Sequence, residues 1–266
     1  MKKLLTIALA IALVAVSALA LAETVVVGAT LVPHAEILEA AKPLLAEKGI
    51  ELEIVEYTDY VLPNEALEAG DLDANYFQHI PYLQNFNEEK GTHLAILVEV
   101  HLEPMGIYVN PKKDITIDTV PDGAVVVVPN DTTNELRAFE VLATYGLLTL
   151  PEDSSLTLTA ADVNGNAEIN PKNLEFVEVE AAQVPRTLAD ADLAVINSNY
   201  ALEAGEDVVG TPVALESTEN NPYNNVVAIR EGDDRDVLKA LAEVLASDEI
   251  AAFITETYGT AVIPVK

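Results

Sequence analysis

The chain has 266 residues, and its 44 aspartates and glutamates against 14 lysines and arginines give a formal net charge of −30 at pH 7. This excess of negative charge excludes nucleic acid as a partner, because a phosphate backbone binds basic surfaces. The sequence has no cysteine, so we expect neither disulfide bonds nor a lipid attached to an N-terminal cysteine.

The first 22 residues have the pattern of a secretory signal peptide. Lys2 and Lys3 precede the uncharged residues 4–22, which end in ALA, with small residues where a signal peptidase needs them. An uncleaved membrane anchor is the alternative, because the run is close to the ~20 residues that span a bilayer. We expect cleavage before Glu23 and export across the inner membrane, giving a periplasmic or extracytoplasmic protein without a lipid anchor.

Residues 24–100 alternate between strand-like and helix-like patterns. The β-branched run TVVVG (24–28) is typical of a strand covered on both faces, and the apolar residues of 34–48 recur at helical spacing until Gly49. A strand, a helix and a second strand in this order predict a parallel pair with a right-handed crossover. The continuing pattern predicts one doubly wound lobe, with strands at 24–28, 51–57, 72–77 and 94–100 and helices at 34–48 and 62–69.

The pattern changes at residues 101–110 (HLEPMGIYVN), where Pro104 and Gly106 interrupt a strand-like run. We interpret this stretch as a crossing into a second lobe, and residues 225–230 as the crossing back. The remaining predicted elements are strands at 124–128, 174–179 and 193–196, helices at 134–145, near Leu188 and up to Ala204, and a long amphipathic helix at 236–258 that returns to the first lobe.

These elements predict an α/β protein of two lobes whose two crossover strands form a hinge, with a ligand cleft between the lobes. We place lobe I at 23–106 plus 226–266 and lobe II at 107–225. A hinge of this kind lets two lobes close around a bound molecule. The geometry therefore favours a binding protein.

Polar and aromatic side chains gather in the stretch from Tyr60 to Tyr82 (YVLPNEALEAGDLDANYFQHIPY). In open α/β sheets the carboxyl ends of the strands border the ligand crevice, and the predicted strand 72–77 ends inside this stretch. We therefore predict one wall of a small-molecule site here. The alternatives are that the rings are ordinary core of the first lobe and that His79 is a structural histidine. The gathered residues are Asn75, Tyr76, Phe77, Gln78, His79 and Tyr82.

Six separated motifs carry a resemblance to a known family. In chain order they are YVLPNEAL, GDLDANYFQHIPY, VPNDTTN, NPKNL, QVPRTL and LAVIN. They resemble the methionine-binding lipoprotein family (MetQ, also called NlpA), the substrate-capture component of an ABC importer, over nearly the whole chain after residue 22. The resemblance implies a two-lobed periplasmic binding protein fold (type II-like), methionine as ligand, and a methionine permease with its ATPase as partners. The missing cysteine departs from the many members that are lipoproteins.

The resemblance also assigns ligand roles to single residues. Arg137, within NDTTNELR, matches the family's carboxylate-binding arginine, and a guanidinium on an early helical turn suits an anion. Asn197 and Asn225 match positions that accept bonds from the ligand's ammonium group or bridge to its carboxylate. Without the family, such an arginine is more often a surface residue, and an asparagine after a strand is more often a turn former.

The predicted wall suits a thioether side chain. Tyr60, Phe77, His79 and Tyr82 would enclose it, because rings offer apolar surface and contacts to sulfur worth ~0.3–1.5 kcal/mol each. We expect a free amino acid, L-methionine, as the ligand, no cofactor, and a monomeric protein.

Three other functions stay open. The same fold could hold another apolar amino acid or a methionine-containing dipeptide. A metal-capturing protein would need ligands that converge on one ion, for which His79, His101, Asp59 and Asp73 are the candidates. An enzyme is the third, but the sequence has no nucleophile elbow, phosphate loop or zinc-binding helix. We therefore expect capture and no catalysis.

Overall fold

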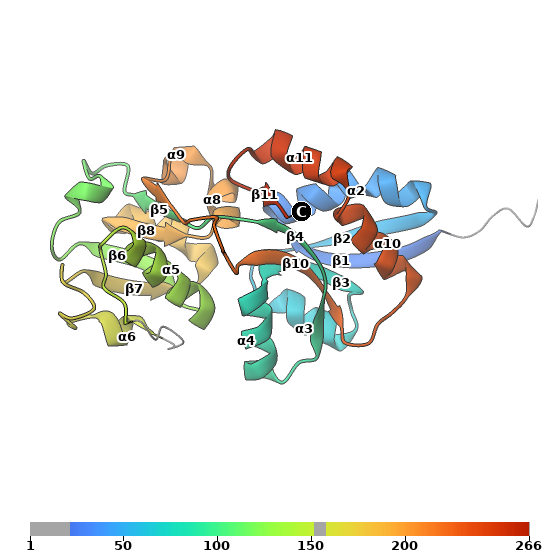
Figure 1. Cartoon of the computed structure of the whole chain (residues 1–266), viewed down its shortest axis with the longest axis horizontal. Coiled ribbons are helices and arrows are strands. Elements are labelled where there is room, and N and C mark those ends of the chain that lie inside the picture. Colours follow the sequence, from blue (N-terminus) through green and yellow to red (C-terminus); the bar gives the residue numbers. More distant parts are fainter. Residues whose placement is uncertain (1–21, 152–157, 266) are drawn as a thin grey trace, which may run out of the picture.

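The structure is a computed structural model that describes residues 22–151 and 158–265. Figure 1 shows two lobes side by side along the longest axis, each built around its own sheet. The predicted signal peptide, apart from Ala22, lies outside the described residues. In the part of the chain that is described, no helix has both the length and the apolar composition that a membrane span requires.

The first sheet consists of β1 (Glu23–Thr30), β2 (Ile50–Tyr57), β3 (Ala74–His79), β4 (Leu94–Leu102), β10 (Asn224–Arg230) and β11 (Ile263–Pro264). Its strand order is β11-β4-β10-β3-β1-β2. β1 runs parallel to β2 and β3, as the predicted crossover requires, while β10 runs antiparallel to β3 and β4. The carboxyl-terminal ends of β1 and β3 therefore lie at the same end of the sheet, and this end faces the second lobe (Figure 1).

Helices cover both faces of this sheet. They are η1 (Leu31–Ala35), α2 (Glu36–Glu47), α3 (Leu62–Ala69), α4 (Ile80–Lys90), α10 (Asp236–Leu245) and α11 (Asp248–Tyr258). α2, α10 and α11 lie together above the sheet in Figure 1, where their apolar faces join one buried core. α3 and α4 lie below it, and Leu67 and Leu83 pack there against Val226.

The single helix predicted at 236–258 is wrong, because the structure has two helices there. α10 ends at Leu245, and Ser247 begins α11 by accepting a hydrogen bond from the Ile250 backbone N–H at 3.3 Å. Serine is a favoured N-cap, and the acidic residues Asp248 and Glu249 in the first turn complement the positive end of the helix dipole. No glycine or proline lies between Asp236 and Tyr258, which is why the stretch reads as one helix.

The second sheet consists of β5 (Gly106–Val109), β6 (Val125–Pro129), β7 (Glu175–Val179), β8 (Leu193–Ile196) and β9 (Ala214–Leu215), in the order β7-β6-β8-β5-β9. β6 is parallel to β7 and β8, and β5 is antiparallel to β8 and β9. The helical segments of this lobe are η2 (Ile117–Thr119), α5 (Thr132–Thr144), α6 (Ala160–Val163), η3 (Ala181–Gln183), α7 (Val184–Thr187), η4 (Leu188–Asp190), α8 (Ser198–Ala204) and α9 (Glu206–Val209).

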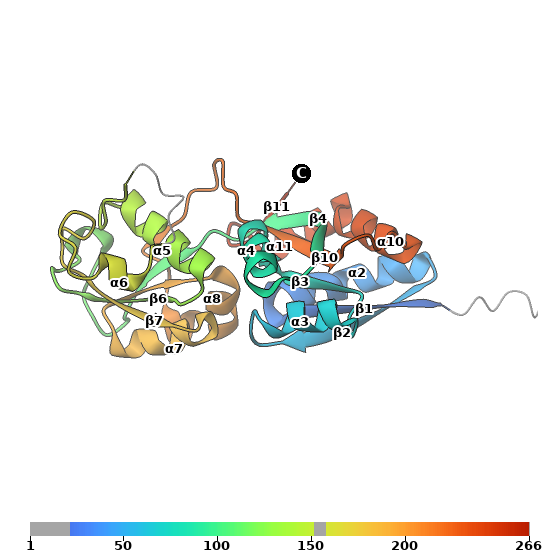
Figure 2. The same cartoon turned by 90° about the horizontal axis from the view of Figure 1, so that it is seen from below.

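Two short segments join the lobes, at 103–105 between β4 and β5 and at 216–223 between β9 and β10. The second crossing predicted at 225–230 is wrong, because these residues form β10 inside the first sheet, where Ala228 pairs with Asn75 and Ile96. The chain changes lobe just before them, in the orange loop that stands out in Figure 2. A β-branched strand and a crossing strand look alike in sequence.

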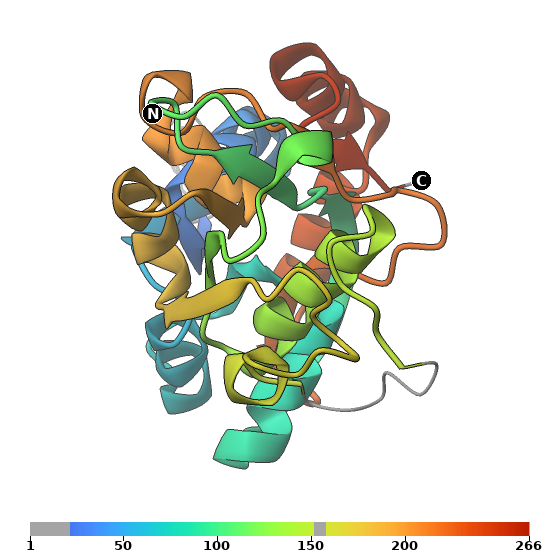
Figure 3. The same ribbon diagram turned by 90° about the vertical axis from the view of Figure 1, so that its left-hand side faces the viewer.

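Each lobe has its own hydrophobic core, and the two-lobed α/β architecture is confirmed. Seen along the long axis from the second lobe, the lobes lie one behind the other (Figure 3). Gly106 pairs with Ile196 in the second sheet, and Asn225 pairs with His79 in the first. Gly106, which we predicted in lobe I, therefore belongs to the sheet of the second lobe. Asn225, which we predicted in lobe II, belongs to the sheet of the first lobe.

Candidate functional site

A narrow pocket lies between the lobes, with room inside for about 20 Å³. All seven residues predicted to bind the ligand line it, so the structure brings together side chains that are far apart in the sequence. These seven are Tyr60, Phe77, His79, Tyr82, Arg137, Asn197 and Asn225. The sequence prediction did not assign the other lining residues to the ligand, and they are Gln78, Glu103, Asn134, Ser198 and Asn199.

One wall of the pocket is aromatic and comes from the first lobe. The Tyr60 ring lies 5.8 Å from Phe77 and 5.7 Å from Tyr82, measured between ring centroids. Tyr82 also donates a hydrogen bond from its hydroxyl to the Tyr60 carbonyl at 2.9 Å, which fixes the two rings relative to each other. Tyr200 of the second lobe packs against Tyr60 from behind, 5.0 Å away between ring centroids, and does not itself line the pocket. The result is an apolar surface that suits an apolar ligand side chain.

His79 connects the two lobes at the end of β3. Its Nδ1 accepts a hydrogen bond from the Tyr82 backbone N–H at 3.1 Å and so caps α4. Nε2 therefore carries the proton and donates to Asn134 Oδ1, 3.0 Å away in the second lobe. Burial, with a smaller effect from Arg137, lowers the pKa of His79 to about 3, so the ring is neutral near pH 7.

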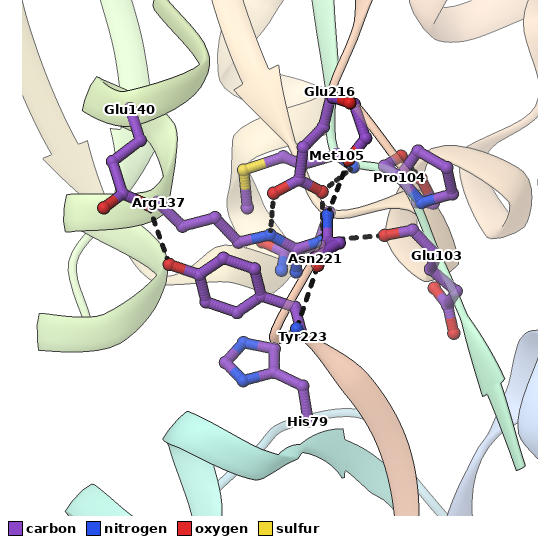
Figure 4. A network of polar contacts seen from close by, with 12 residues as sticks. His79, Glu103, Pro104, Met105, Arg137, Glu140, Glu216, Asn221 and Tyr223 are labelled. Atoms are coloured by element: carbon purple, nitrogen blue, oxygen red, sulfur yellow. Dashed lines mark hydrogen bonds and ion pairs between the residues drawn. The ribbon is translucent and has the colours of Figure 1, made fainter. Parts of the chain in front are cut away.

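Arg137 projects from α5 towards the hinge, where it is already paired (Figure 4). Its Nε and Nη2 donate to the two carboxylate oxygens of Glu216 at 2.9 and 2.6 Å, and Nη2 also donates to the Glu103 carbonyl at 2.7 Å. The guanidinium lies over the Tyr223 ring, 4.2 Å from its centroid. Arg137 is 2% exposed. Arg137 lines the pocket as predicted, but its positive charge is paired with Glu216, which the sequence analysis did not connect to it.

Two amide side chains in the pocket have an atom without a partner among the described residues. Asn197 donates from Nδ2 to Asn134 Oδ1 at 2.7 Å, but its Oδ1 is buried and accepts no hydrogen bond. Asn199 accepts from the Tyr60 hydroxyl at 2.5 Å, but its Nδ2 is buried and donates none. An unsatisfied buried polar group costs roughly 1–3 kcal/mol. One free acceptor and one free donor therefore face a pocket that a polar ligand could satisfy.

Of the two amides that we predicted in this wall, Gln78 lines the pocket and Asn75 does not. Gln78 Nε2 donates to Asn64 Oδ1 at 2.7 Å and to Asn75 Oδ1 at 2.9 Å, and Asn75 Nδ2 donates to Asn64 Oδ1 at 2.8 Å. All three side chains are buried. This amide network ties α3 to β3 and so supports the aromatic wall from behind.

The metal ligands considered from the sequence do not come together. His79 is bonded to Asn134, and Asp59 accepts from the backbone at the start of α3. Asp73 pairs with Arg235 at 2.8 Å. Within residues 22–151 and 158–265, the only group of three or more potential metal ligands is His34, His101 and Glu103, whose ligand atoms lie within 4.8 Å of one another.

Several residues of the site were missed for identifiable reasons. Glu103 lies in a stretch interpreted only as a crossing, and Asn199 follows Asn197 in an NSN run that looks like a turn. Asn134 belongs to the NDTTN motif, where it holds Asp131 at the start of α5. An isolated acid inside an apolar crossing was the available signal for Glu103. The pairing of Glu216 with Arg137 has no local signal.

The comparisons with known proteins agree on one family. A family model described as NlpA lipoprotein matches residues 25–266. The methionine-binding lipoprotein MetQ of Bacillus subtilis is 41% identical over 246 residues, covering 91% of this chain and 88% of that protein. An ABC transporter periplasmic substrate-binding protein from Coxiella burnetii has a TM-score of 0.82 at 37% identity, covering 91% of this chain and 100% of that chain. A nutrient-binding protein from Burkholderia cenocepacia, solved bound to methionine, has a TM-score of 0.80 at 36% identity over the same shares.

The prediction of a protein without a lipid anchor is contradicted by these relatives. The matching family is described as a lipoprotein family, and the B. subtilis relative is named a lipoprotein. The inference used the lack of cysteine in this chain, which is a fact of the sequence. The predicted absence of a lipid anchor is therefore wrong, because the family and the B. subtilis relative that this chain matches are both named lipoproteins.

The predicted periplasmic binding protein fold is confirmed by the solved relatives, which align over more than nine-tenths of the chain. The family model covers almost the whole described structure, including both lobes and the pocket between them. The chain belongs to the NlpA lipoprotein family.

Proposed function

We propose that this protein is the substrate-binding component of an ABC importer and captures free methionine in the pocket between its lobes. The observation that carries the proposal is the combination of an aromatic wall with two buried amides that lack a partner, at Asn197 and Asn199. A zwitterionic amino acid with an apolar side chain has matching groups. The methionine-bound relative from B. cenocepacia supports the same ligand.

Each predicted residue then has a role. Tyr60, Phe77, His79 and Tyr82 surround the thioether, which gains ~0.3–1.5 kcal/mol from each good contact between sulfur and a ring. The carboxylate of the ligand meets Arg137 and the free Nδ2 of Asn199. Asn197 and Asn225 face the polar end of the ligand, where Asn197 Oδ1 is the free acceptor for an ammonium group.

Closure of the hinge is the second part of the proposal. His79 and Tyr60 of the first lobe bond to Asn134 and Asn199 of the second, and Tyr200 donates to the Thr58 carbonyl across the same gap at 3.2 Å. These bonds have to break for a ligand to enter. The lobes therefore open around the segments at 103–105 and 216–223, and the closed form presents the ligand to a permease with its ATPase. The binding protein acts as a monomer.

The side chains of the pocket point to capture without catalysis. Burial keeps His79 neutral, with a pKa of about 3, and both of its ring nitrogens are engaged in hydrogen bonds, so it is not set up as a general base.

A thermal-shift screen tests the proposal. A ligand that binds only the folded protein raises its apparent stability by mass action, by ~2.7 kcal/mol at 100 times the dissociation constant. The screen covers the twenty amino acids, their D-forms and methionine-containing dipeptides. We expect methionine to give the largest rise in Tm. A larger rise with a dipeptide or with another amino acid would replace methionine as the ligand, and no rise with any of them would refute the proposal.

A further inference from the structure

Tyr60 differs from the other two rings of the aromatic wall in how its own lobe holds it. Phe77 belongs to β3 and Tyr82 to α4, and both are buried. Tyr60 lies in the connector between β2 and α3, residues 58–61, which is neither helix nor strand. Among the described residues, its own lobe gives it one hydrogen bond, from the Tyr82 hydroxyl to its carbonyl at 2.9 Å. Of the three rings, Tyr60 is therefore fixed least by the first lobe.

The second lobe holds Tyr60 and its connector through two residues of α8. The Tyr200 ring packs against the Tyr60 ring with 5.0 Å between centroids and 31° between planes, closer than either neighbouring ring of the first lobe, at 5.8 and 5.7 Å. The Tyr200 hydroxyl also donates to the carbonyl of Thr58, two positions before Tyr60, at 3.2 Å. Asn199 accepts from the Tyr60 hydroxyl at 2.5 Å. α8 thus contacts both the ring and the backbone of the connector.

Tyr200 is itself a fixed part of the second lobe. It is 5% exposed and belongs to a buried cluster that includes Val184 of α7 and Ile196 of β8. Of the described residues that pack against this cluster, Tyr60 alone comes from the first lobe. A core of the second lobe therefore extends across the gap to one ring of the aromatic wall, and it does so only while the lobes are together.

The stacked pair of rings stands between two spaces that the lobes share. Tyr60 lines the pocket, whereas Tyr200 lines a second space with room for about 220 Å³. That space has Thr58 of the first lobe on one side and Arg186 of the second lobe on the other. Because the contact between the rings crosses the gap, opening of the lobes separates them and leaves the Tyr60 ring without support on the face turned away from the pocket.

We propose that Tyr200 is a positioning residue, which holds the Tyr60 ring against the side chain of the ligand as the lobes close. The inference rests on the proposed function and deepens it, because it names what makes the pocket select a long apolar side chain. The aromatic wall is then complete only in the closed form. An amino acid docks on one lobe with little discrimination between side chains, and closure makes the selection.

Calorimetry with methionine and alanine tests this role in two variants of Tyr200. Tyr200→Leu keeps apolar bulk and removes the ring, whereas Tyr200→Phe keeps the ring and removes only the bond to Thr58. Only methionine has a side chain long enough to reach the Tyr60 ring. We therefore expect Tyr200→Leu to lower the ratio of methionine affinity to alanine affinity ~2-fold to ~10-fold, which is the worth of one aromatic pair. In Tyr200→Phe the ratio should stay as in the wild type.

The two affinities taken singly distinguish positioning from simple attraction between the lobes. Loss of the bond to Thr58 makes closure less favourable for any ligand, so Tyr200→Phe should weaken methionine and alanine by the same factor. If Tyr200→Leu also leaves the ratio unchanged, Tyr200 at most holds the lobes together and the proposal is overturned. Failure of methionine to bind the wild type would instead refute the proposed function, so the two failures give different results.

Hydrogen exchange in the wild type keeps the test decisive if Tyr200→Leu does not fold. The backbone N–H groups of Val61 and Leu62 donate to Asp59 within the same segment, at 2.7 and 2.8 Å, so their exchange reports its local opening. We expect both to exchange more slowly with saturating methionine, because α8 then holds the connector. The amides of β3, inside the first sheet, are the reference and should be protected in both conditions. Equal exchange at Val61 and Leu62 with and without methionine would mean that the first lobe alone positions Tyr60, against the proposal.

Discussion

Arg137 shows how strongly the role of one residue depends on neighbours that are distant in sequence. Its motif and its early place in α5 were enough to predict that it reaches the pocket. Glu216 lies 79 positions further along and takes two of its nitrogens, and no local pattern indicates that pairing. The guanidinium is therefore a fixed part of the hinge, and under the proposed function a ligand can bond to it only where Glu216 leaves it free.

Arg137→Ala is expected to reduce both stability and affinity. The change leaves Glu216 without its partner, and breaking a buried ion pair from one side costs ~3–5 kcal/mol. The affinity for methionine should fall at least ~10-fold, because each charge-assisted bond is worth ~1.5–3 kcal/mol. Urea denaturation and calorimetry measure the two effects separately.

The double variant Arg137→Ala/Glu216→Gln separates the two roles of the arginine. Removing the charge of Glu216 as well should restore part of the lost stability, since no carboxylate is left unpaired. The affinity should stay low, because the ligand's carboxylate still lacks its cation. Full recovery of affinity in the double variant would show that Arg137 serves Glu216 alone.

At the scale of elements, the junction of β3 and α4 was the most predictable part of the site. Strand, proline and ring cluster lie within one short stretch, and the rule that ligands bind at the carboxyl ends of strands placed them correctly. Of the polar members of the stretch, Gln78 lines the pocket, whereas Asn75 bonds to Asn64 behind it. A side chain's direction at the end of a strand depends on tertiary partners that a single sequence does not show.

The aromatic wall predicts a selective loss of affinity. Phe77→Ala and Tyr82→Ala should weaken methionine more than alanine, because only the longer side chain reaches the rings, and each buried methylene is worth ~0.8 kcal/mol. Phe77→Leu serves as the milder control, since it keeps apolar bulk and loses the ring. Calorimetry with both amino acids measures the difference. Equal losses for the two ligands would mean that these rings only support the fold.

For the whole molecule, three buried neutral histidines make stability depend on pH. Burial lowers the pKa values of His34, His79 and His101 to about 4, about 3 and about 3. Below pH ~6.5 the unfolded chain binds protons on these residues that the folded protein does not bind. Each histidine therefore removes up to ~1.4 kcal/mol of stability per pH unit as the pH falls from ~6.5 towards 4. The raised pKa values of Glu103, Asp131 and Glu135 act in the opposite direction.

Urea denaturation between pH 7 and pH 5 measures this dependence. The loss of unfolding free energy between pH 7 and pH 5 should be greater in the wild type than in His79→Gln, because the variant lacks one histidine that the fold keeps neutral. His93→Gln is the matched control, because the His93 side chain is 72% exposed. An equal slope in the wild type and in His79→Gln would show that His79 is not held neutral by the fold.

The proposed function requires that two lobes close around one free amino acid, with rings on one side and a guanidinium on the other. A crystal structure of the protein grown with methionine would show whether they do. We expect the sulfur against Tyr60, Phe77 and Tyr82, the carboxylate within hydrogen-bond distance of Arg137, and the ammonium group at Asn197 Oδ1. Methionine lying outside this pocket, or turned so that its sulfur faces Arg137, would contradict the claim.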